Sequence, residues 1–324
     1  MRRTIATLIA LALSGIAAAP VGAAPTSSTG PKAASLNIVL LTNDSFDPYY
    51  ITVAAGAKAE AKKLGANLSW VAPANPTVPL QTQVLNATIA KKPDFVLMSA
   101  VDAKAMVAPM KALKKAGIPI VTIDSDVIDK SVRLGSITSD NEAGGRLAAL
   151  VMSRLVGSGK VAYQGYTPGI QSVDQRHAGW LAGLKLHKGL IDAGSSYDNY
   201  DLKDIAAKAS ALMQRNSDLK GIFTPATNEG IGTASAVQAA GKAGKVHVIG
   251  FDASPDEVLA LRRGTISALI VQKAYGMGVL GVDYAVRYLK SGTKVPATTK
   301  VGFVVATKAN IGDANVSKYI YRAK

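Results

Sequence analysis

Residues 119–124 (PIVTID) and residues 246–252 (VHVIGFD) are two short β-branched runs, and each ends on an aspartate. Continuous apolar runs of this length are typical of buried strands in a parallel sheet, and ligands bind outside the carboxyl ends of such strands. Asp124 lies in the first half of the chain and Asp252 in the second. We therefore predict that two acids enter one cleft from opposite walls and hold a small polar solute.

From Leu36 onward, short apolar runs alternate with helical patterns, which predicts parallel sheets covered by helices on both faces. The polar segment 138–145 (TSDNEAGG) follows a strand expected at a sheet edge, and it indicates a break between two five-stranded lobes. A long helix at 275–290 is expected to cross back to the first lobe, and one last strand follows within 301–307 (VGFVVAT). The predicted fold class is α/β, with two doubly wound parallel-sheet lobes joined by a multi-strand hinge that suits closure on a ligand.

The first residues of the chain are typical of a secretory signal peptide. Arg2 and Arg3 precede an apolar stretch that is followed by small residues, and the expected cleavage site lies after Ala23. The apolar run is shorter than the ~20 residues that a membrane span needs. We expect a signal peptide at 1–23 and a linker at 24–35. The N-terminal lobe is expected to cover 36–139 plus 273–300, and the C-terminal lobe 140–272 plus 301–324.

The chain contains no cysteine. It therefore has no disulfide, no thiol chemistry and no cysteine behind the signal to which a lipid could be attached. This composition favours a protein that diffuses freely in the periplasm, and we expect a monomer that is not lipid-anchored.

The formal charge of +15 falls to +13 once Arg2 and Arg3 leave with the signal peptide. The lysines are spread over helical segments, without a dense basic run or interleaved aromatic residues, so we expect solvated helix faces and no nucleic-acid partner. Residues 276–281 (GMGVLG) match the glycine spacing of a dinucleotide-binding turn, but no acid follows at the required distance. Close helix packing explains these glycines better.

Enzymatic function is not favoured by the motifs. The sequence has no Walker loop, no HExxH or GxSxG motif and no paired metal-ligand spacing, and its three histidines have no evident partners for nucleophilic catalysis. We expect no catalytic residue, no metal and no cofactor. A binding protein is favoured over the alternative of an exported enzyme. A third hypothesis, the sensor half of a sugar-responsive repressor, would need a DNA-binding helix-turn-helix in place of the signal peptide, and the sequence has none.

The segment 42–50 (TNDSFDPYY) is the richest in candidate ligand-binding residues, because it lies where the first strand meets the first helix. Pro48 suits a first helical turn and Asp47 is a natural N-cap. Tyr49 and Tyr50 offer aromatic faces that pack on the C–H faces of sugars. Two adjacent tyrosines on one helical turn are not expected to face inward together, so at least one should line the cleft. In the alternative interpretation, Asp47 is only a helix cap and both tyrosines are core residues.

Other polar side chains follow the predicted strands or begin the helices after them. Arg176 can make a bidentate contact with hydroxyls or a carboxylate, or alternatively a surface salt bridge with Asp174. Asn228 begins a helix and could cap it or donate to a ligand, while Ser254 is expected to cap the helix that starts at Pro255. The remaining candidates at strand ends are Ser125, Tyr200 and Gln272.

Taken in order, these segments resemble the type I periplasmic sugar-binding proteins of ABC importers, the ribose-binding-protein group. The resemblance rests on DPYY, IPIVTID, DQRHAGW, VIGFDASPDE and ALIVQ, and it covers nearly all of the mature chain. It implies that the sugar is bound by residues at the matching positions, namely Asp47, Tyr49, Tyr50, Asp124, Arg176, Tyr200, Asp252 and Gln272. It also implies delivery of the solute to a membrane permease.

Two positions depart from the pattern of ribose binders. Ser125 stands where an arginine is common, and Ala226 stands where an asparagine is common. Both changes remove hydrogen-bonding reach and reshape the pocket, which argues against ribose itself. The solute could instead be another pentose, a hexose, a sugar alcohol or a furanose-like signal such as autoinducer-2. A role in presenting the ligand to a chemoreceptor is also compatible with the sequence.

Overall fold

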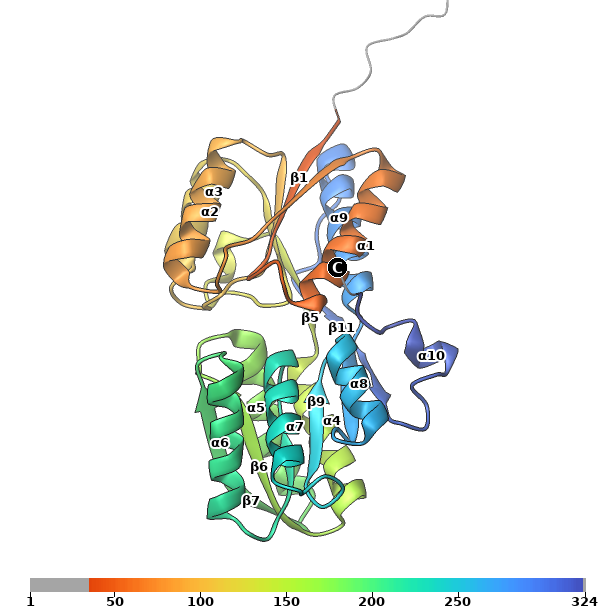
Figure 1. The fold of residues 1–324 in the computed structure, drawn as a ribbon. Coiled ribbons are helices and arrows are strands. Elements are labelled where there is room, and N and C mark those ends of the chain that lie inside the picture. The colour runs from red at the N-terminus through yellow and green to blue at the C-terminus, as the bar shows by residue number, and fades with distance from the viewer. Residues whose placement is uncertain (1–34, 323–324) are drawn as a thin grey trace, which may run out of the picture. The chain divides into compact units, whose positions relative to one another are not determined.

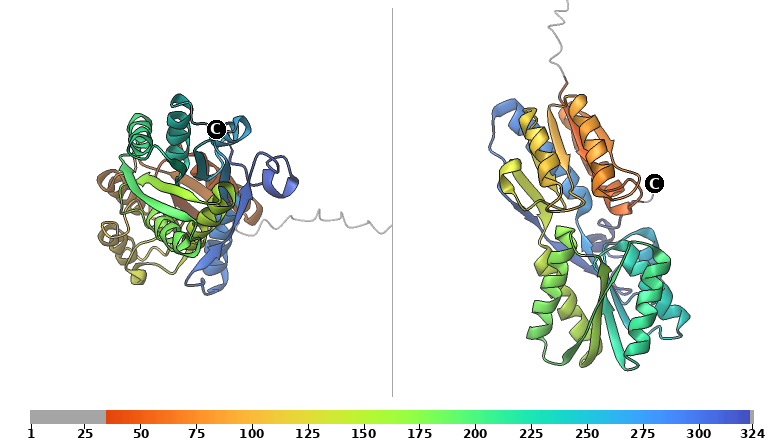
Figure 2. Two further views of the ribbon diagram at one scale, coloured as in Figure 1. Left: turned by 90° about the horizontal axis from the view of Figure 1, so that it is seen from below. Right: turned by 90° about the vertical axis from the view of Figure 1, so that its left-hand side faces the viewer.

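The computed structural model describes residues 35–322, in which the strands form two separate six-stranded sheets (Figure 1). The predicted signal peptide, residues 1–23, lies outside the described residues, and so does the predicted linker at 24–35 apart from Ser35. Helices cover both faces of the strands (Figure 2). This arrangement confirms the predicted fold class of two doubly wound α/β lobes.

The first sheet is parallel throughout and has the order β11-β5-β4-β3-β1-β2. Its strands are β1 (Asn37–Leu41), β2 (Asn67–Val71), β3 (Phe95–Met98), β4 (Ile120–Ile123), β5 (Gly135–Ser139) and β11 (Thr299–Val301). The helices of this lobe are α1 (Pro48–Leu64), α2 (Val78–Ala90), α3 (Val107–Lys115) and α9 (Ala274–Ser291), with a short 3₁₀ turn at Lys130–Val132. The long helix α9 packs against α1, which confirms that it returns to the first lobe.

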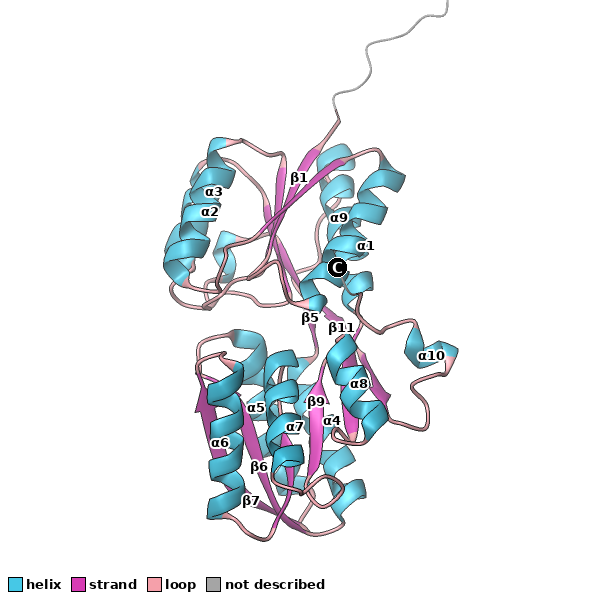
Figure 3. Cartoon of the chain, viewed as in Figure 1, coloured by secondary structure: helices cyan, strands magenta, loops and turns pink. Residues whose placement is uncertain are grey.

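The second sheet has the order β12-β10-β9-β8-β6-β7, and only its edge strand β12 runs antiparallel to its neighbour. Helices flank the strands of this sheet (Figure 3). Its strands are β6 (Gly159–Tyr166), β7 (Leu190–Asp198), β8 (Leu219–Phe223), β9 (His247–Phe251), β10 (Ala268–Gln272) and β12 (Phe303–Ala306). The accompanying helices are α4 (Asn141–Val156), α5 (Gln171–Leu186), α6 (Leu202–Arg215), α7 (Thr227–Ala239), α8 (Pro255–Arg263) and α10 (Ala314–Ser317).

The prediction of five strands in each lobe was wrong, and the C-terminal segment is the reason. The run expected to form a single strand is divided at Gly302, so that β11 joins the first sheet and β12 joins the second. Because β11 pairs with β5, that strand does not lie at the edge of its sheet, contrary to expectation. An apolar run of this length does not reveal from sequence that its two halves pair with different sheets.

The chain passes between the two sheets at three places, near Asp140, Lys273 and Gly302. Hydrogen bonds join these crossings: the Ser139 hydroxyl donates to Oε1 of Gln272 at 2.6 Å, and the Asp140 N–H donates to the Val301 carbonyl at 3.1 Å. The predicted multi-strand connection is therefore a hydrogen-bonded bundle of three segments, of the kind about which lobes can close.

Two helix starts that face the space between the sheets are formed as predicted. Asp47 caps α1 by accepting a hydrogen bond from the Tyr49 N–H, and Pro48 occupies the first helical position. Ser254 caps α8 in a capping box, in which Glu257 bonds back to the Ser254 N–H. These caps stabilise the turns that follow β1 and β9, and so they position the residues at the sheet edges.

In residues 35–322, no helix has both the length and the hydropathy needed to cross a membrane.

Candidate functional site

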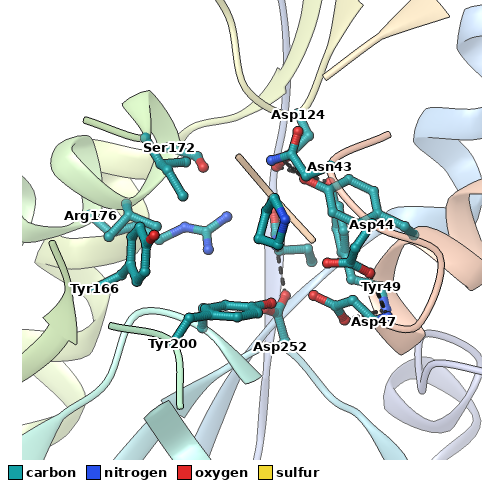
Figure 4. A pocket seen from close by; sticks show the side chains of 16 residues that line it. Asn43, Asp44, Asp47, Tyr49, Asp124, Tyr166, Ser172, Arg176, Tyr200 and Asp252 are labelled. Atoms are coloured by element: carbon teal, nitrogen blue, oxygen red, sulfur yellow. Dashed lines mark hydrogen bonds between the residues drawn. The ribbon is translucent and has the colours of Figure 1, made fainter. Parts of the chain in front are cut away.

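A cavity of about 60 Å³ lies between the carboxyl ends of the two sets of strands (Figure 4). A volume of this size holds about four to six water molecules, which is the scale of one small solute. Most of the residues predicted from sequence line it: Asp47, Tyr49, Tyr50, Asp124, Arg176, Tyr200, Asp252 and Gln272. Asp124 follows β4 of the first sheet and Asp252 follows β9 of the second, so acids from both lobes reach the same pocket.

Asp124 is held by four hydroxyl groups. Tyr50 donates to its Oδ2 at 2.8 Å and Tyr49 to its Oδ1 at 3.2 Å, while Ser99 and Ser125 each lie 3.3 Å from Oδ2. The expectation that Tyr49 and Tyr50 cannot both face inward was wrong, because both rings are buried and both hydroxyls converge on this carboxylate. The two side chains pack edge-to-face, with ring centroids 5.0 Å apart.

Asp252 is held by two donors on a single oxygen. Gln272, the last residue of β10, donates to Oδ1 at 2.7 Å, and the Tyr321 hydroxyl donates to the same oxygen at 2.6 Å. Burial raises the pKa of the Asp252 carboxyl, whereas the nearby Arg176 guanidinium opposes this shift. Tyr321 was missed by sequence reasoning, because it belongs to a C-terminal segment that carries no recognisable strand or turn signal at that position.

Backbone strain is concentrated in this pocket. Asp124, Tyr200 and Asp252 have φ values of 68°, 71° and 98°, and the one other non-glycine residue with positive φ in the described part of the chain is Lys92. Positive φ is sterically unfavourable for residues with a Cβ, and such strain persists mainly where the surroundings enforce it, often at functional sites. The strain at the two strand-end acids is consistent with side chains held in a fixed direction for binding.

Arg176 reaches the pocket from α5 and is buried, so the alternative of a surface salt bridge with Asp174 is wrong. Its Nε donates to Oδ1 of Asn141 at 2.9 Å, and its Nη1 donates to the Pro225 carbonyl at 2.7 Å. The guanidinium also lies over the Phe251 ring, 3.9 Å from the centroid. These contacts fix the orientation of the guanidinium in the lining of the cavity.

The other predicted site residues, Ser125 and Asn228, do not line the cavity. The Ser125 hydroxyl lies 2.7 Å from that of Ser172, so it joins the first lobe to the second beside the pocket. Asn228 lies at a neighbouring hollow that also contains Asp47 and Tyr200. It is not the cap of α7, because that position is occupied by Ala226, which itself lines the cavity.

Sequence reasoning named Ala226 only as a departure from the ribose-binder pattern, and it missed seven other lining residues, namely Asn43, Asp44, Pro76, Tyr166, Ile170, Ser172 and Val173. A signal was present for Asp44, which lies in the same polar turn as Asp47 and accepts hydrogen bonds from the Phe46 and Asp47 N–H groups through Oδ1. Tyr166 packs edge-to-face on Tyr200, with centroids 5.6 Å apart, and its position at the end of β6 could have suggested a role.

The pocket has an acidic character. Burial raises the pKa of Asp44. Burial, together with the nearby carboxylates of Asp44 and Asp252, raises the pKa of Asp47 well above its usual range. Among the residues that the structure describes, no group of three or more acidic, histidine or cysteine side chains has the arrangement needed for a metal ion.

Comparison with known proteins places the chain in a family. Residues 38–294 match the model of the periplasmic binding protein domain. The chain belongs to the periplasmic binding protein family. This match confirms the family resemblance found in the sequence, and members of this family pair two α/β lobes as this chain does.

Individual relatives support the same assignment. The ribose import binding protein of Escherichia coli is 28% identical over 273 residues, which are 84% of this chain and 90% of that protein. A solute-binding protein of an ABC transporter from Agrobacterium vitis, solved with α-D-tagatopyranose, is 33% identical with a TM-score of 0.87. A second protein from that organism, solved with D-fucose, is 31% identical with a TM-score of 0.83. The alignments cover 89% and 88% of this chain and 100% of each solved chain.

Proposed function

We propose that this chain is a periplasmic solute-binding protein that captures a monosaccharide or a sugar alcohol between its lobes and delivers it to the permease of an ABC importer. The observation that carries the proposal is the convergence of Asp124 and Asp252, one from each lobe, on a single small cavity. The relatives support it, since they include a ribose import binding protein and two solute-binding proteins solved with tagatose and with D-fucose.

The proposed ligand-binding residues are the predicted residues that line the cavity, led by Asp47, Asp124, Arg176 and Asp252, with Gln272 holding Asp252 in place. Tyr166 and Tyr200 supply aromatic surface at the second-lobe wall. Hydrogen bonds to charged side chains contribute ~1.5–3 kcal/mol each. Three such groups together with aromatic packing are sufficient for micromolar affinity, which corresponds to ~8 kcal/mol, after the ordering costs of binding.

The proposed mechanism is closure of two rigid bodies, residues 36–139 plus 273–301 and residues 140–272 plus 302–322, with the last boundary at the crossing near Gly302. Contacts beside the cavity join the two lobes, since the Ala103 N–H donates to the Gly169 carbonyl at 3.2 Å and the Asp126 N–H donates to Oε1 of Gln171 at 3.1 Å. Closure removes water from the charged groups that hold the solute, and it creates the surface that the permease recognises.

Export belongs to the same proposal. A signal peptide at 1–23 would direct the chain to the periplasm, where an unanchored monomer could diffuse to its permease. Amino-terminal sequencing of the periplasmic fraction should give a mature chain that begins at Ala24. Recovery of the uncut chain from the cytoplasm would contradict this part of the proposal.

The binding function is tested by titration calorimetry of the mature chain after unfolding and refolding to remove any retained solute. The panel contains pentoses, hexoses, their amino derivatives and polyols, with a disaccharide as the size control. We expect one site per chain with micromolar affinity or better, recovery of the solute unchanged, and no binding of the disaccharide. Absence of binding across the panel, or conversion of a sugar into product, would overturn the proposal.

A further inference from the structure

Acidic side chains outnumber basic side chains in the lining of the cavity. Asp44, Asp47, Asp124 and Asp252 contribute carboxylates, whereas the one cationic side chain among the described lining residues is that of Arg176. Arg176 is already held by protein acceptors, the Asn141 side chain and the Pro225 carbonyl. When its four carboxyls are ionised, the lining therefore carries more negative charge than the single guanidinium neutralises.

The carboxylates differ in how many protein donors they have. Both oxygens of Asp124 accept hydrogen bonds from side-chain hydroxyls. By contrast, Asp44, Asp47 and Asp252 each use only Oδ1 for protein donors among the described residues. Each of these three acids is thus left with one oxygen, Oδ2, that a solute can reach.

The three incompletely bonded acids lie together. Figure 4 shows the carboxylates of Asp44, Asp47 and Asp252 pointing toward the same corner of the pocket, while Arg176 extends into the pocket from the side of Ser172 and Tyr166. Asp44 and Asp252 are almost fully buried, at 5% and 3% exposure. Like charges held this close in a poorly hydrated site repel one another, and the raised pKa of Asp47 reflects this crowding together with burial.

A neutral sugar does not relieve this repulsion, because its hydroxyls supply hydrogen-bond donors without a positive charge. An ammonium group supplies three donors and a full charge, which matches three carboxylate oxygens at one corner. Resting on the proposed function, we infer that the solute is a polyhydroxylated amine, such as an amino sugar or an amino polyol, whose ammonium group is bound by Asp44, Asp47 and Asp252. Its hydroxyls would then face Arg176 and the tyrosines that line the pocket.

The test compares matched triplets in calorimetric titrations: glucosamine, glucose and N-acetylglucosamine, and the corresponding galactose and mannose series. The titrations use buffer near neutral pH, because acidic buffer would favour the neutral carboxyl of Asp47, whose pKa is raised. Charge-assisted hydrogen bonds are roughly twice as strong as neutral ones, so the amine of at least one series should bind about tenfold more tightly than its neutral and N-acetylated counterparts.

Two variants test whether the ammonium group binds at this corner of the pocket. Asp47→Asn retains the N-cap, because asparagine caps helices as well as aspartate does, but it removes one of the three charges. It should bring the ratio of amine to neutral affinity close to one. The control Asp256→Asn removes an equal charge from an exposed position on α8, and it should keep the wild-type ratio.

The remaining outcomes separate the inference from the proposed function. If a neutral sugar binds as tightly as its amine or more tightly, the inference is overturned and the sugar-binding function stands. If the preference for the amine persists in Asp47→Asn, the assignment of the ammonium group to this corner is wrong. If no member of any series or of the wider panel binds, the proposed function fails as well.

Discussion

The Tyr50 hydroxyl donates to Oδ2 of Asp124 at 2.8 Å, and so joins the first helix of the chain to the strand-end acid of β4. Both side chains are buried, and the Tyr49 hydroxyl donates to the other oxygen of the same carboxylate. Besides its proposed role in binding, Asp124 therefore accepts hydrogen bonds from the hydroxyl groups of two buried tyrosines. A change at Asp124 should affect the stability of the unliganded protein as well as its affinity for solute.

Replacement of Asp124 by alanine should lower the free energy of unfolding of the unliganded protein by about 1–3 kcal/mol, because two buried hydroxyls lose an acceptor. Alanine is also unfavourable at the φ of 68° found at this position. Asp124→Asn is the matched control, since its amide oxygen still accepts one hydroxyl and asparagine tolerates positive φ. Urea denaturation followed by circular dichroism measures both. An unfolding midpoint of Asp124→Ala equal to that of the wild type would contradict this account.

The glycines of the 276–281 segment give a second prediction, on helix packing. A Cβ at Gly278 would lie 2.0 Å from the Val53 carbonyl oxygen of α1, whereas a Cβ at Gly276 would have no atom within 4 Å. Gly278→Ala should therefore force α9 away from α1 and destabilise the fold by about 1–3 kcal/mol. Gly276→Ala should be neutral or stabilising by about 0.5–1 kcal/mol, because alanine is the better helix former. Thermal denaturation of the two variants compares them directly, and equal effects would refute the packing explanation.

Glu229 on α7 gives a prediction for the pH dependence of stability. Its side chain is fully buried, and among the described residues neither of its carboxylate oxygens has a hydrogen-bond partner. Burial, together with the nearby Asp198 carboxylate, raises the pKa of Glu229 from 4.5 to about 8. Between these two values the folded protein keeps a proton that the unfolded chain releases. Stability should therefore fall as the pH rises through this window, by at most about 1.4 kcal/mol per pH unit from this group.

Glu229→Gln removes this ionisation while keeping nearly the same shape. The variant should gain stability relative to the wild type as the pH rises from about 4.5 to about 8, and the gain should level off above that range. Urea unfolding at a series of pH values measures the difference. The exposed Glu142→Gln serves as the control, and its expected effect is small because it loses only an exposed ion pair with Arg146. A constant difference between Glu229→Gln and the wild type would show that Glu229 does not titrate in this window.

Sequence reasoning succeeded where a local pattern determines position. The strand-end acids Asp124 and Asp252 were predicted because apolar runs show where parallel strands end, and residues that follow those ends meet at one edge of each sheet. The Asp47 and Ser254 caps were predicted because capping depends on only a few neighbouring residues. These local rules need no knowledge of how distant segments pack.

Contacts between distant segments could not be predicted in the same way. Tyr321 reaches Asp252 from 69 positions away, and the division of the last strand at Gly302 depends on which sheet offers a free edge. The inward orientation of both Tyr49 and Tyr50 depends on Asp124, a carboxylate more than 70 residues further along the chain. Helical periodicity alone would have placed one of the two tyrosines outward, because it takes no account of a buried acceptor between them.

The central claim is that acids from two lobes hold one solute in a shared cavity. The most direct test is calorimetric titration of the tightest-binding solute into the wild type, Asp124→Ala and Asp252→Ala, with Asp256→Ala as the control. We predict one site per chain in the wild type and the control, and a loss of about tenfold or more in affinity in each of the other two variants, since each lobe loses a charged hydrogen-bonding group. Wild-type affinity in either Asp124→Ala or Asp252→Ala, with the fold intact by circular dichroism, would contradict the claim.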